Sequence, residues 1–305
     1  AISPLTIHRP SARLGRAMIV SASYRTDIPA FYAEWFRNRR AAGFAMVRNP
    51  YGGKDYRVSL ARQDVDAFVF WTRNAAPMLD DFARLHDEGT PFTVTMSILG
   101  YPKQLDARVI DTDTAIAQLR RIAAIHPRGG VWRYDPILVS DLTPPDWHRE
   151  NFARLSGALA GVVDEVTISF ATIYAKSRRN LARAFGGRES WRDPEAAEKR
   201  ELLAELAAIA RENGQRLTIC SQPDLTGDGV EPARCIDSVR LADAGGRPFK
   251  AKTKGNRPGC LCAESRDIGA YDTCPHGCAY CYAVKRREKA IVFARDHDPA
   301  TERLG

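Results

Sequence analysis

Short apolar runs recur along the chain and predict the strands of a buried sheet, because they are rich in β-branched and aromatic residues. They cover 18–23, 44–49, 56–60, 67–73, 92–97, 131–136, 165–170 and 216–220. Some, such as 67–71, are apolar at successive positions, as expected for strands that are covered on both faces. Residues 50–53, Pro-Tyr-Gly-Gly, predict a turn between the second and third runs.

Segments with helical spacing lie between the apolar runs. We predict helices at 29–42, 111–125, 145–160 and 193–214. Pro29 falls in the first turn of the first helix, and Gly43 lies just past its end. Asp193 is the expected N-cap of the last helix, with Pro194 at its first position and Gly214 at its end. Alternation of strands and helices predicts an α/β fold with a parallel sheet, and about seven strands suit a full or partial (β/α) barrel.

Polar side chains stand at the carboxyl ends of these strands, where (β/α) barrels form their active sites. We take five of them as candidate catalytic residues: Arg25, Asp27, Arg73, Arg133 and Asp135. An arginine there can hold a carboxylate or phosphate in a bidentate fork. The alternative is that the Arg and Asp residues form ion pairs that brace the rim of the barrel. The chain shows no Ser-His-Asp order, no phosphate-cradling glycine loop and no pair of catalytic carboxylates.

Three cysteines near the C-terminus, Cys274, Cys278 and Cys281, have C-x3-C-x2-C spacing. Three thiolates can hold three irons of a [4Fe–4S] cluster and leave the fourth iron open for a small ligand. The alternatives are a structural zinc with His276 as fourth ligand, or ordinary thiols. Zinc sites usually pair two C-x2-C-like units, so the spacing favours iron–sulfur.

The other four cysteines match the ligand number of a closed metal site: Cys220, Cys235, Cys260 and Cys262. We expect them to hold an auxiliary [4Fe–4S] cluster, which gives the chain two clusters, or a structural zinc. The alternative is that Cys220 is a buried core thiol, since free cysteine is often fully buried.

Composition and net charge limit the classes of protein to which the chain can belong. With 305 residues, 44% hydrophobic and 27% charged, the chain resembles a soluble globular protein. The net charge of +8 favours an anionic small molecule or nucleic acid as partner. No apolar run approaches the roughly 18 residues of a membrane span and no secretory signal is evident, so we expect a cytoplasmic protein without membrane contact. We expect a flexible tail over 1–17, for which a targeting peptide is the alternative, and one domain over 18–305 with its cluster-binding region at 216–285.

The C-x3-C-x2-C spacing with Tyr280 before the last cysteine resembles the signature of the radical SAM enzymes. The resemblance implies that the open iron binds the amino and carboxylate groups of S-adenosylmethionine. Cleavage of the sulfonium would give a 5′-deoxyadenosyl radical that abstracts hydrogen from an unknown substrate. It also implies an electron donor such as flavodoxin or ferredoxin, and it places Tyr280 near the adenine.

Several separate stretches resemble a bacterial family described as domain of unknown function 1848. They are 21–32, 47–50, 69–74, 132–137 and 267–274, together with the cysteine signature. The chain departs from the family at Tyr24, where a second Arg is usual, at Arg73, where Lys is usual, and at Ala75, where Pro is usual. Arg and Lys are not equivalent where geometry matters, so a substrate contact at Arg73 would differ from that of relatives.

The order of the motifs implies a rearranged barrel. Radical SAM domains usually carry their cysteines after the first strand, whereas here they come last, so the resemblance implies a circularly permuted barrel of radical SAM type. The strand at 18–23 would then lie beside the cluster loop, and Ser21, Ser23, Arg25 and Asp27 would face the amino group of S-adenosylmethionine.

Two functions of different classes therefore stand as hypotheses. The first is a radical SAM enzyme that uses S-adenosylmethionine and two clusters. The alternative is a nucleic-acid-binding protein stabilised by zinc or iron–sulfur, without radical chemistry. A loose resemblance of the segment at 49–51 to the spore photoproduct lyase group joins the two, because those enzymes repair DNA by radical chemistry.

Overall fold

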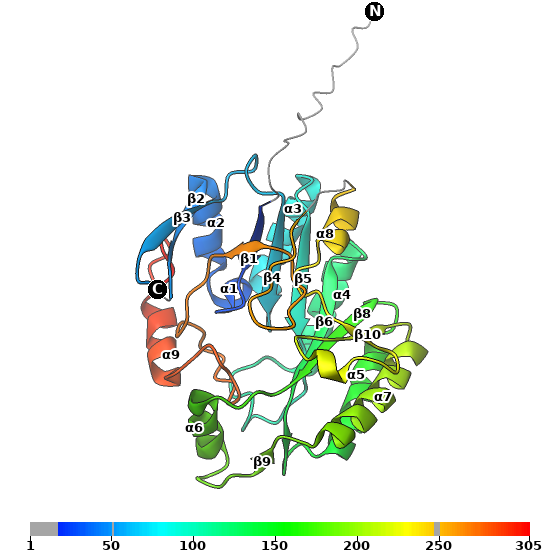
Figure 1. Cartoon of the computed structure of the whole chain (residues 1–305). Coiled ribbons are helices and arrows are strands. Elements are labelled where there is room, and N and C mark those ends of the chain that lie inside the picture. Colours follow the sequence, from blue (N-terminus) through cyan, green and yellow to red (C-terminus); the bar gives the residue numbers. More distant parts are fainter. Residues whose placement is uncertain (1–17, 51, 247–250) are drawn as a thin grey trace, which may run out of the picture.

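The computed structural model describes residues 18–50, 52–246 and 251–305. The tail predicted over 1–17 lies outside these ranges. Within them, eight strands form one sheet in the order β11-β10-β8-β6-β5-β4-β1-β12 (Figure 1). The strands are β1 Ile19–Ala22, β4 Ala67–Thr72, β5 Phe92–Ser97, β6 Gly130–Ile137, β8 Glu165–Phe170, β10 Arg216–Ile219, β11 Val230–Pro232 and β12 Ser265–Asp267. Every neighbouring pair is parallel, which confirms the predicted α/β fold.

The sheet is open rather than a closed barrel. Its order ends at β11 on one side and at β12 on the other, and each of these edge strands has only three residues. A barrel closes only when its two edges pair along their length. The full barrel that the strand count allowed is therefore wrong, and the described residues form an open, parallel α/β sheet.

Two smaller sheets lie outside the main one. Strands β2 Phe44–Arg48 and β3 Asp55–Ser59 pair antiparallel, so the runs predicted at 44–49 and 56–60 form a hairpin of their own. Strands β7 Val139–Ser140 and β9 Trp191–Arg192 form a second antiparallel pair.

Helices lie between most of the strands of the main sheet. They are α1 Ile28–Phe31, α2 Ala33–Ala42, α3 Leu79–Asp87, α4 Thr112–Ile125, α5 Pro145–Ala158, α6 Ala175–Ala184, α7 Ala196–Glu212, α8 Ser238–Gly245 and α9 Arg287–Asp296, with 3-10 turns η1 Ala76–Met78 and η2 Pro223–Leu225. In the described ranges, none of them is both long and apolar enough to span a bilayer.

Two helix boundaries differ from the sequence prediction. The helix predicted at 29–42 is divided at Tyr32 into α1 and α2. The predicted start at Asp193 is wrong, because α7 begins at Ala196 with Glu195 as its N-cap. The Asp193 carboxylate instead pairs with the Lys199 ammonium at 2.6 Å, so it does not cap the backbone.

The two faces of the sheet bury different partners, because side chains alternate along each strand. In β1 and β4, one set packs with the helices: Val20, Ala22, Phe68 and Phe70. The other set lies on the face of the sheet that we call the inner face, and it consists of Ile19, Ala67, Val69 and Trp71. These side chains pack against the segment that carries the second group of cysteines. In Figure 1 this yellow-to-orange segment crosses in front of the sheet. The C-terminal third of the chain therefore covers the inner face.

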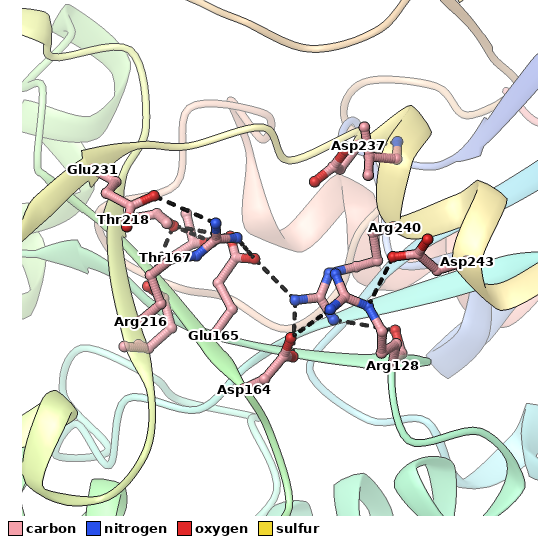
Figure 2. A network of polar contacts seen from close by, with 12 residues as sticks. Arg128, Asp164, Glu165, Thr167, Arg216, Thr218, Glu231, Asp237, Arg240 and Asp243 are labelled. Atoms are coloured by element: carbon pink, nitrogen blue, oxygen red, sulfur yellow. Dashed lines mark hydrogen bonds and ion pairs between the residues drawn. The ribbon is translucent and has the colours of Figure 1, made fainter. Parts of the chain in front are cut away.

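A network of ion pairs holds the amino-terminal edge of the sheet (Figure 2). Arg240 of α8 is only 2% exposed and pairs with Asp164 at 2.8 Å and Glu165 at 2.9 Å. Glu165 also pairs with Arg216 at 2.8 Å, which joins β8 to β10. Arg128 pairs with Asp164 as well and extends the network to Asp243 of α8. Glu165 and Arg216 are the first residues of β8 and β10, so the network braces the edge opposite the predicted active site.

Candidate functional site

The loop that carries Cys274, Cys278 and Cys281 follows β12 and is clasped by the segment after β5. The backbone N–H of Ala279 donates to the carbonyl of Leu105 at 2.8 Å. The N–H of Arg108 donates to the carbonyl of His276 at 3.0 Å. Two segments about 170 residues apart, 102–108 and 274–281, thus form one unit at the carboxyl edge of the sheet.

All three of these cysteines line one cavity of about 230 Å³. All are free thiols. Burial raises the pKa of Cys274, Cys278 and Cys281, so without a compensating cation each thiol is held neutral. A coordinated metal deprotonates a thiol outright, so a metal group bound here would have to offset this effect of burial.

Arg73, directly after β4, connects the sheet to the cysteine loop. Its guanidinium forms a bidentate pair with Asp106, at 3.0 Å and 2.6 Å, and donates to the Cys278 sulfur at 3.3 Å. It also contacts the hydroxyl of Tyr280, which donates to Asp106 at 2.7 Å. Burial alone would lower the pKa of Arg73, but the negative charge of Asp106 raises it above its usual value. Arg73 is therefore a permanent cation next to a cysteine sulfur.

Asp27 holds the other side of the loop. Its carboxylate caps α1 through the N–H of Ala30 at 2.9 Å and accepts from the Arg73 N–H at 2.8 Å. It also lies 2.7 Å from Nε2 of His276, between Cys274 and Cys278. The Nδ1 atom of His276 is buried and has no hydrogen-bond partner in the described part of the chain. Asp27 is thus a positioning residue for the loop.

Ser21, Ser23 and Arg25 converge on a carboxylate. The hydroxyls of Ser21 and Ser23 donate to Asp267 at 2.8 Å and 2.7 Å, and Nε of Arg25 lies 3.6 Å from it. Burial raises the pKa of Asp267, while Arg25 and the two hydroxyls oppose that rise. Three of the four residues predicted to face S-adenosylmethionine, Ser21, Ser23 and Arg25, thus contact Asp267 of β12.

The second group of cysteines gathers on the inner face of the sheet. The sulfurs of Cys220 and Cys235 lie 3.5 Å apart, and the Cys262 sulfur accepts the N–H of Ile236 at 3.4 Å. A hydrogen bond with Cys262 lowers the pKa of Cys260 to about 6. The structure therefore brings together all four cysteines that the sequence assigned to one site.

Two arginines donate to this quartet. Arg133 of β6 donates to Cys235 at 3.0 Å, and Arg257 donates to Cys220 at 3.2 Å. Arg133 also pairs with Asp135 at 2.6 Å. Arg133 and Asp135 therefore lie at the quartet and not with Arg73 at the three-cysteine loop.

Aromatic side chains lie between the two cysteine groups. The Trp71 ring stands 5.2 Å from the Arg133 guanidinium and packs edge-on with Tyr24, centroid to centroid at 6.3 Å. The carbonyl of Tyr24 accepts a hydrogen bond at 2.6 Å from Tyr282, the residue after Cys281. A continuous set of contacts thus joins the quartet to the three-cysteine loop.

The donor sets have the chemistry of iron–sulfur ligands: three thiols on a cavity, and four thiols near two cationic donors. Among the described residues, no three His, Cys, Asp or Glu side chains converge so as to hold a single metal ion. A cluster binds its thiolates through separate irons and does not need ligands to meet at one ion. The two groups therefore offer three and four thiols, which are the donor numbers of an open and a closed [4Fe–4S] site.

Sequence reasoning missed Asp106, Asp267 and Arg257. Asp106 lies in a loop without periodicity, and only the folded chain brings it to Arg73. Asp267 stands in a stretch that matched the family, and that match was the one available signal. Arg257 follows a run of lysines that resembles a solvated loop, yet its guanidinium reaches Cys220.

A protein-family model described as "Domain of unknown function (DUF1848)" matches residues 19–283. No curated protein matches the chain. Among solved structures, a D-hydantoinase from Bacillus sp. AR9 gives a TM-score of 0.31 at 11% identity, over 75% of this chain and 43% of that one. The pneumococcal virulence factor StrH gives 0.28 at 11% identity, over 76% and 63%. The chain thus spans less than two thirds of either protein, and at such TM-scores neither likeness bears on fold or function.

Proposed function

Since the chain belongs to the DUF1848 family, we propose from its site that it is an iron–sulfur enzyme of the radical SAM type. Cys274, Cys278 and Cys281 would hold three irons of a [4Fe–4S] cluster and leave the fourth iron open to S-adenosylmethionine. The observation that carries the proposal is that Cys274, Cys278 and Cys281 are free and line one cavity.

The place of β12 supports the proposed link to radical SAM barrels. The cysteine loop follows β12, and β12 pairs in parallel with β1 at the edge of the sheet. In those barrels the cysteines follow the first strand, so β12 would take the place of their first strand and β1 that of their second. We therefore propose a circularly permuted, partial barrel of this type.

When bound, such a cluster would supply the electron for reductive cleavage of S-adenosylmethionine and so give access to hydrogen-abstraction chemistry. The protein's own residues would position and tune the site. Arg73 donates to the Cys278 sulfur, and hydrogen bonds to cluster sulfurs shift reduction potentials. Asp106 fixes the Arg73 guanidinium, and Asp27 fixes His276 in the loop. These partners would keep the ligands in one orientation, as outer-shell residues do at metal sites.

We further propose that the quartet holds an auxiliary cluster that passes electrons. Four protein thiolates would leave no iron open, which suits transfer better than substrate binding. Arg133 and Arg257 would offset the negative charge of the thiolates. The contacts through Trp71 and Tyr24 support a route between the two groups. Cysteines kept as thiols suit a reducing compartment, so we propose a cytoplasmic enzyme with a flavodoxin or ferredoxin as donor.

The test is iron and sulfide analysis of anaerobically purified protein, with EPR of the reduced form with and without S-adenosylmethionine. We expect about eight irons per chain and a [4Fe–4S]⁺ signal that S-adenosylmethionine perturbs. Cys278→Ala should abolish cleavage of S-adenosylmethionine, whereas Cys262→Ala, the matched change in the quartet, should lose auxiliary iron and keep the perturbed signal.

Zinc without iron after attempted reconstitution would overturn the proposal. Salt-dependent binding of DNA or RNA by such a zinc protein would then favour the nucleic-acid-binding alternative. Wild-type turnover by Cys278→Ala would refute the assignment of the open-iron site.

A further inference from the structure

The cavity at the three cysteines has further lining that its role as a cluster site does not require. Gln104 contributes from the segment after β5, Asn180 and Arg183 from α6, and Arg287 and Glu288 from α9. This lining holds two guanidinium groups and two amides against one carboxylate. This part of the lining therefore favours an anionic group.

Arg287 is the central residue of this lining. Its guanidinium lies against Gly277 in the cysteine loop, because a Cβ atom built on Gly277 would come within 2.8 Å of its Cζ. Its Nε atom is buried and has no hydrogen-bond partner in the described part of the chain. In the same ranges no carboxylate pairs with Arg287, in contrast to Arg73 and Arg133. A partly buried guanidinium without an anion is costly, and a ligand that supplies the anion removes that cost.

Arg183 is the second cation of this lining. It lies 3.2 Å from Glu288, and both side chains are 70% exposed. Exposed pairs of this kind are weak, so Arg183 is free to exchange its carboxylate for an anionic ligand. Arg183 and Arg287 come from different helices, α6 and α9, and both line the cavity that contains the cysteines.

We propose that Arg287, with Arg183 and Asn180, forms a binding site for a phosphate or carboxylate group of the ligand that occupies this cavity. Guanidinium groups bind both anions through paired, charge-assisted hydrogen bonds. The identity of the ligand as substrate or S-adenosylmethionine rests on the proposed function, whereas the anion site rests on the cavity alone. The substrate class that follows is a phosphorylated or carboxylated molecule.

The site is tested by labelling arginines with phenylglyoxal on the full-length protein as purified, with each arginine quantified by mass spectrometry. Inorganic phosphate should slow the labelling of Arg287 and Arg183 several-fold. It should leave Arg295 unchanged, because Arg295 lies at the far end of α9 and pairs with Asp296. Equal labelling of Arg287 with and without phosphate would overturn the anion site.

A second arm distinguishes the two sources of the anion. S-adenosylmethionine carries a carboxylate that methylthioadenosine lacks. If S-adenosylmethionine protects Arg287 from phenylglyoxal and methylthioadenosine does not, the site binds the methionine carboxylate. Protection by phosphate in the presence of saturating S-adenosylmethionine would assign it to the substrate.

A variant supplies the third measurement. Arg287→Gln should raise the phosphate concentration that half-protects Arg183 by about tenfold, as expected for loss of a charge-assisted hydrogen bond. Arg295→Gln is the matched control and should leave it unchanged. An unchanged value in Arg287→Gln would refute the role of Arg287. Phosphate protection in a protein without iron would retain the anion site and reject the radical SAM proposal, so the two can fail separately.

Discussion

Removal of the charge of Asp106 should destabilise the protein more than any exposed acid-to-amide change. Asp106 is 3% exposed and is the carboxylate that pairs with the buried Arg73. In Asp106→Asn the side chain keeps its shape, but the Arg73 charge is left without its anion. Removing one partner of a buried pair costs about 3–5 kcal/mol.

That cost translates into a measurable shift in melting temperature. Unfolding entropy of about 2.1 cal/mol/K per residue gives about 0.64 kcal/mol/K for 305 residues. The melting temperature of Asp106→Asn should therefore fall by about 5–8 °C. Differential scanning calorimetry of the anaerobically purified protein measures it.

The control is Asp113→Asn, an exposed change in the first turn of α4, which should shift the melting temperature by about 1 °C or less. A double variant, Arg73→Met with Asp106→Leu, should lose less than Asp106→Asn alone, because it leaves no unpaired charge. Equal melting temperatures for Asp106→Asn and Asp113→Asn would refute the reasoning. A double variant less stable than Asp106→Asn would show that the hydrogen bonds, and not the charge, carry the cost.

Two further predictions concern stability away from the cysteines. Burial lowers the pKa of His148 to about 4, below the usual 6.5. The folded protein therefore takes up this proton at a lower pH than the unfolded chain does. Its contribution is complete above pH 6.5 and is lost as pH falls toward 4, with about 2 kcal/mol gone at pH 5. His148→Gln should therefore reduce the drop in melting temperature between pH 7 and pH 5, and an unchanged drop would contradict the burial effect. Arg240→Met should lower the melting temperature by several degrees, since it leaves Asp164 and Glu165 without a buried partner, yet iron content should stay at the wild-type value. Loss of iron in that variant would contradict the separation of the two edges of the sheet.

The sequence predicts the long strands well because they are rich in β-branched and aromatic residues over five or six positions. The strand predicted at 165–170 is β8 with the same bounds, and 92–97 is β5. Strand β12 was missed because Ser-Arg-Asp has no apolar pattern, and only its pairing with β1 makes it a strand. Its three residues nevertheless determine where the cysteine loop begins. Long-range backbone pairing of this kind leaves no trace in local composition.

For the candidate site, the sequence indicated which residues to consider but not which of them lie together. The sequence prediction assigned Arg133 and Arg73 to one active site, because both follow or end strands of the sheet. In the folded chain the Arg133 guanidinium donates to Cys235 instead. Strand position alone does not show which face a side chain takes or what covers that face. Ser21 and Ser23 were assigned to S-adenosylmethionine from the order of the motifs, and their contact with Asp267, 246 and 244 residues away, was not foreseen. Tertiary contacts at that separation are beyond local pattern reasoning.

The junction of β1 with β12 sets an order of events during synthesis. Ser21 leaves the ribosome 246 residues before Asp267, which at about 5–20 residues per second is a delay of about 12–50 s. Throughout that interval the outer edge of β1 has no strand beside it and the cysteine loop does not yet exist. Unpaired strand edges are where nascent chains aggregate, so β12 protects the outer edge of β1 once it has been made. A metal group held by Cys274, Cys278 and Cys281 is therefore acquired only after the strands of the main sheet have been made.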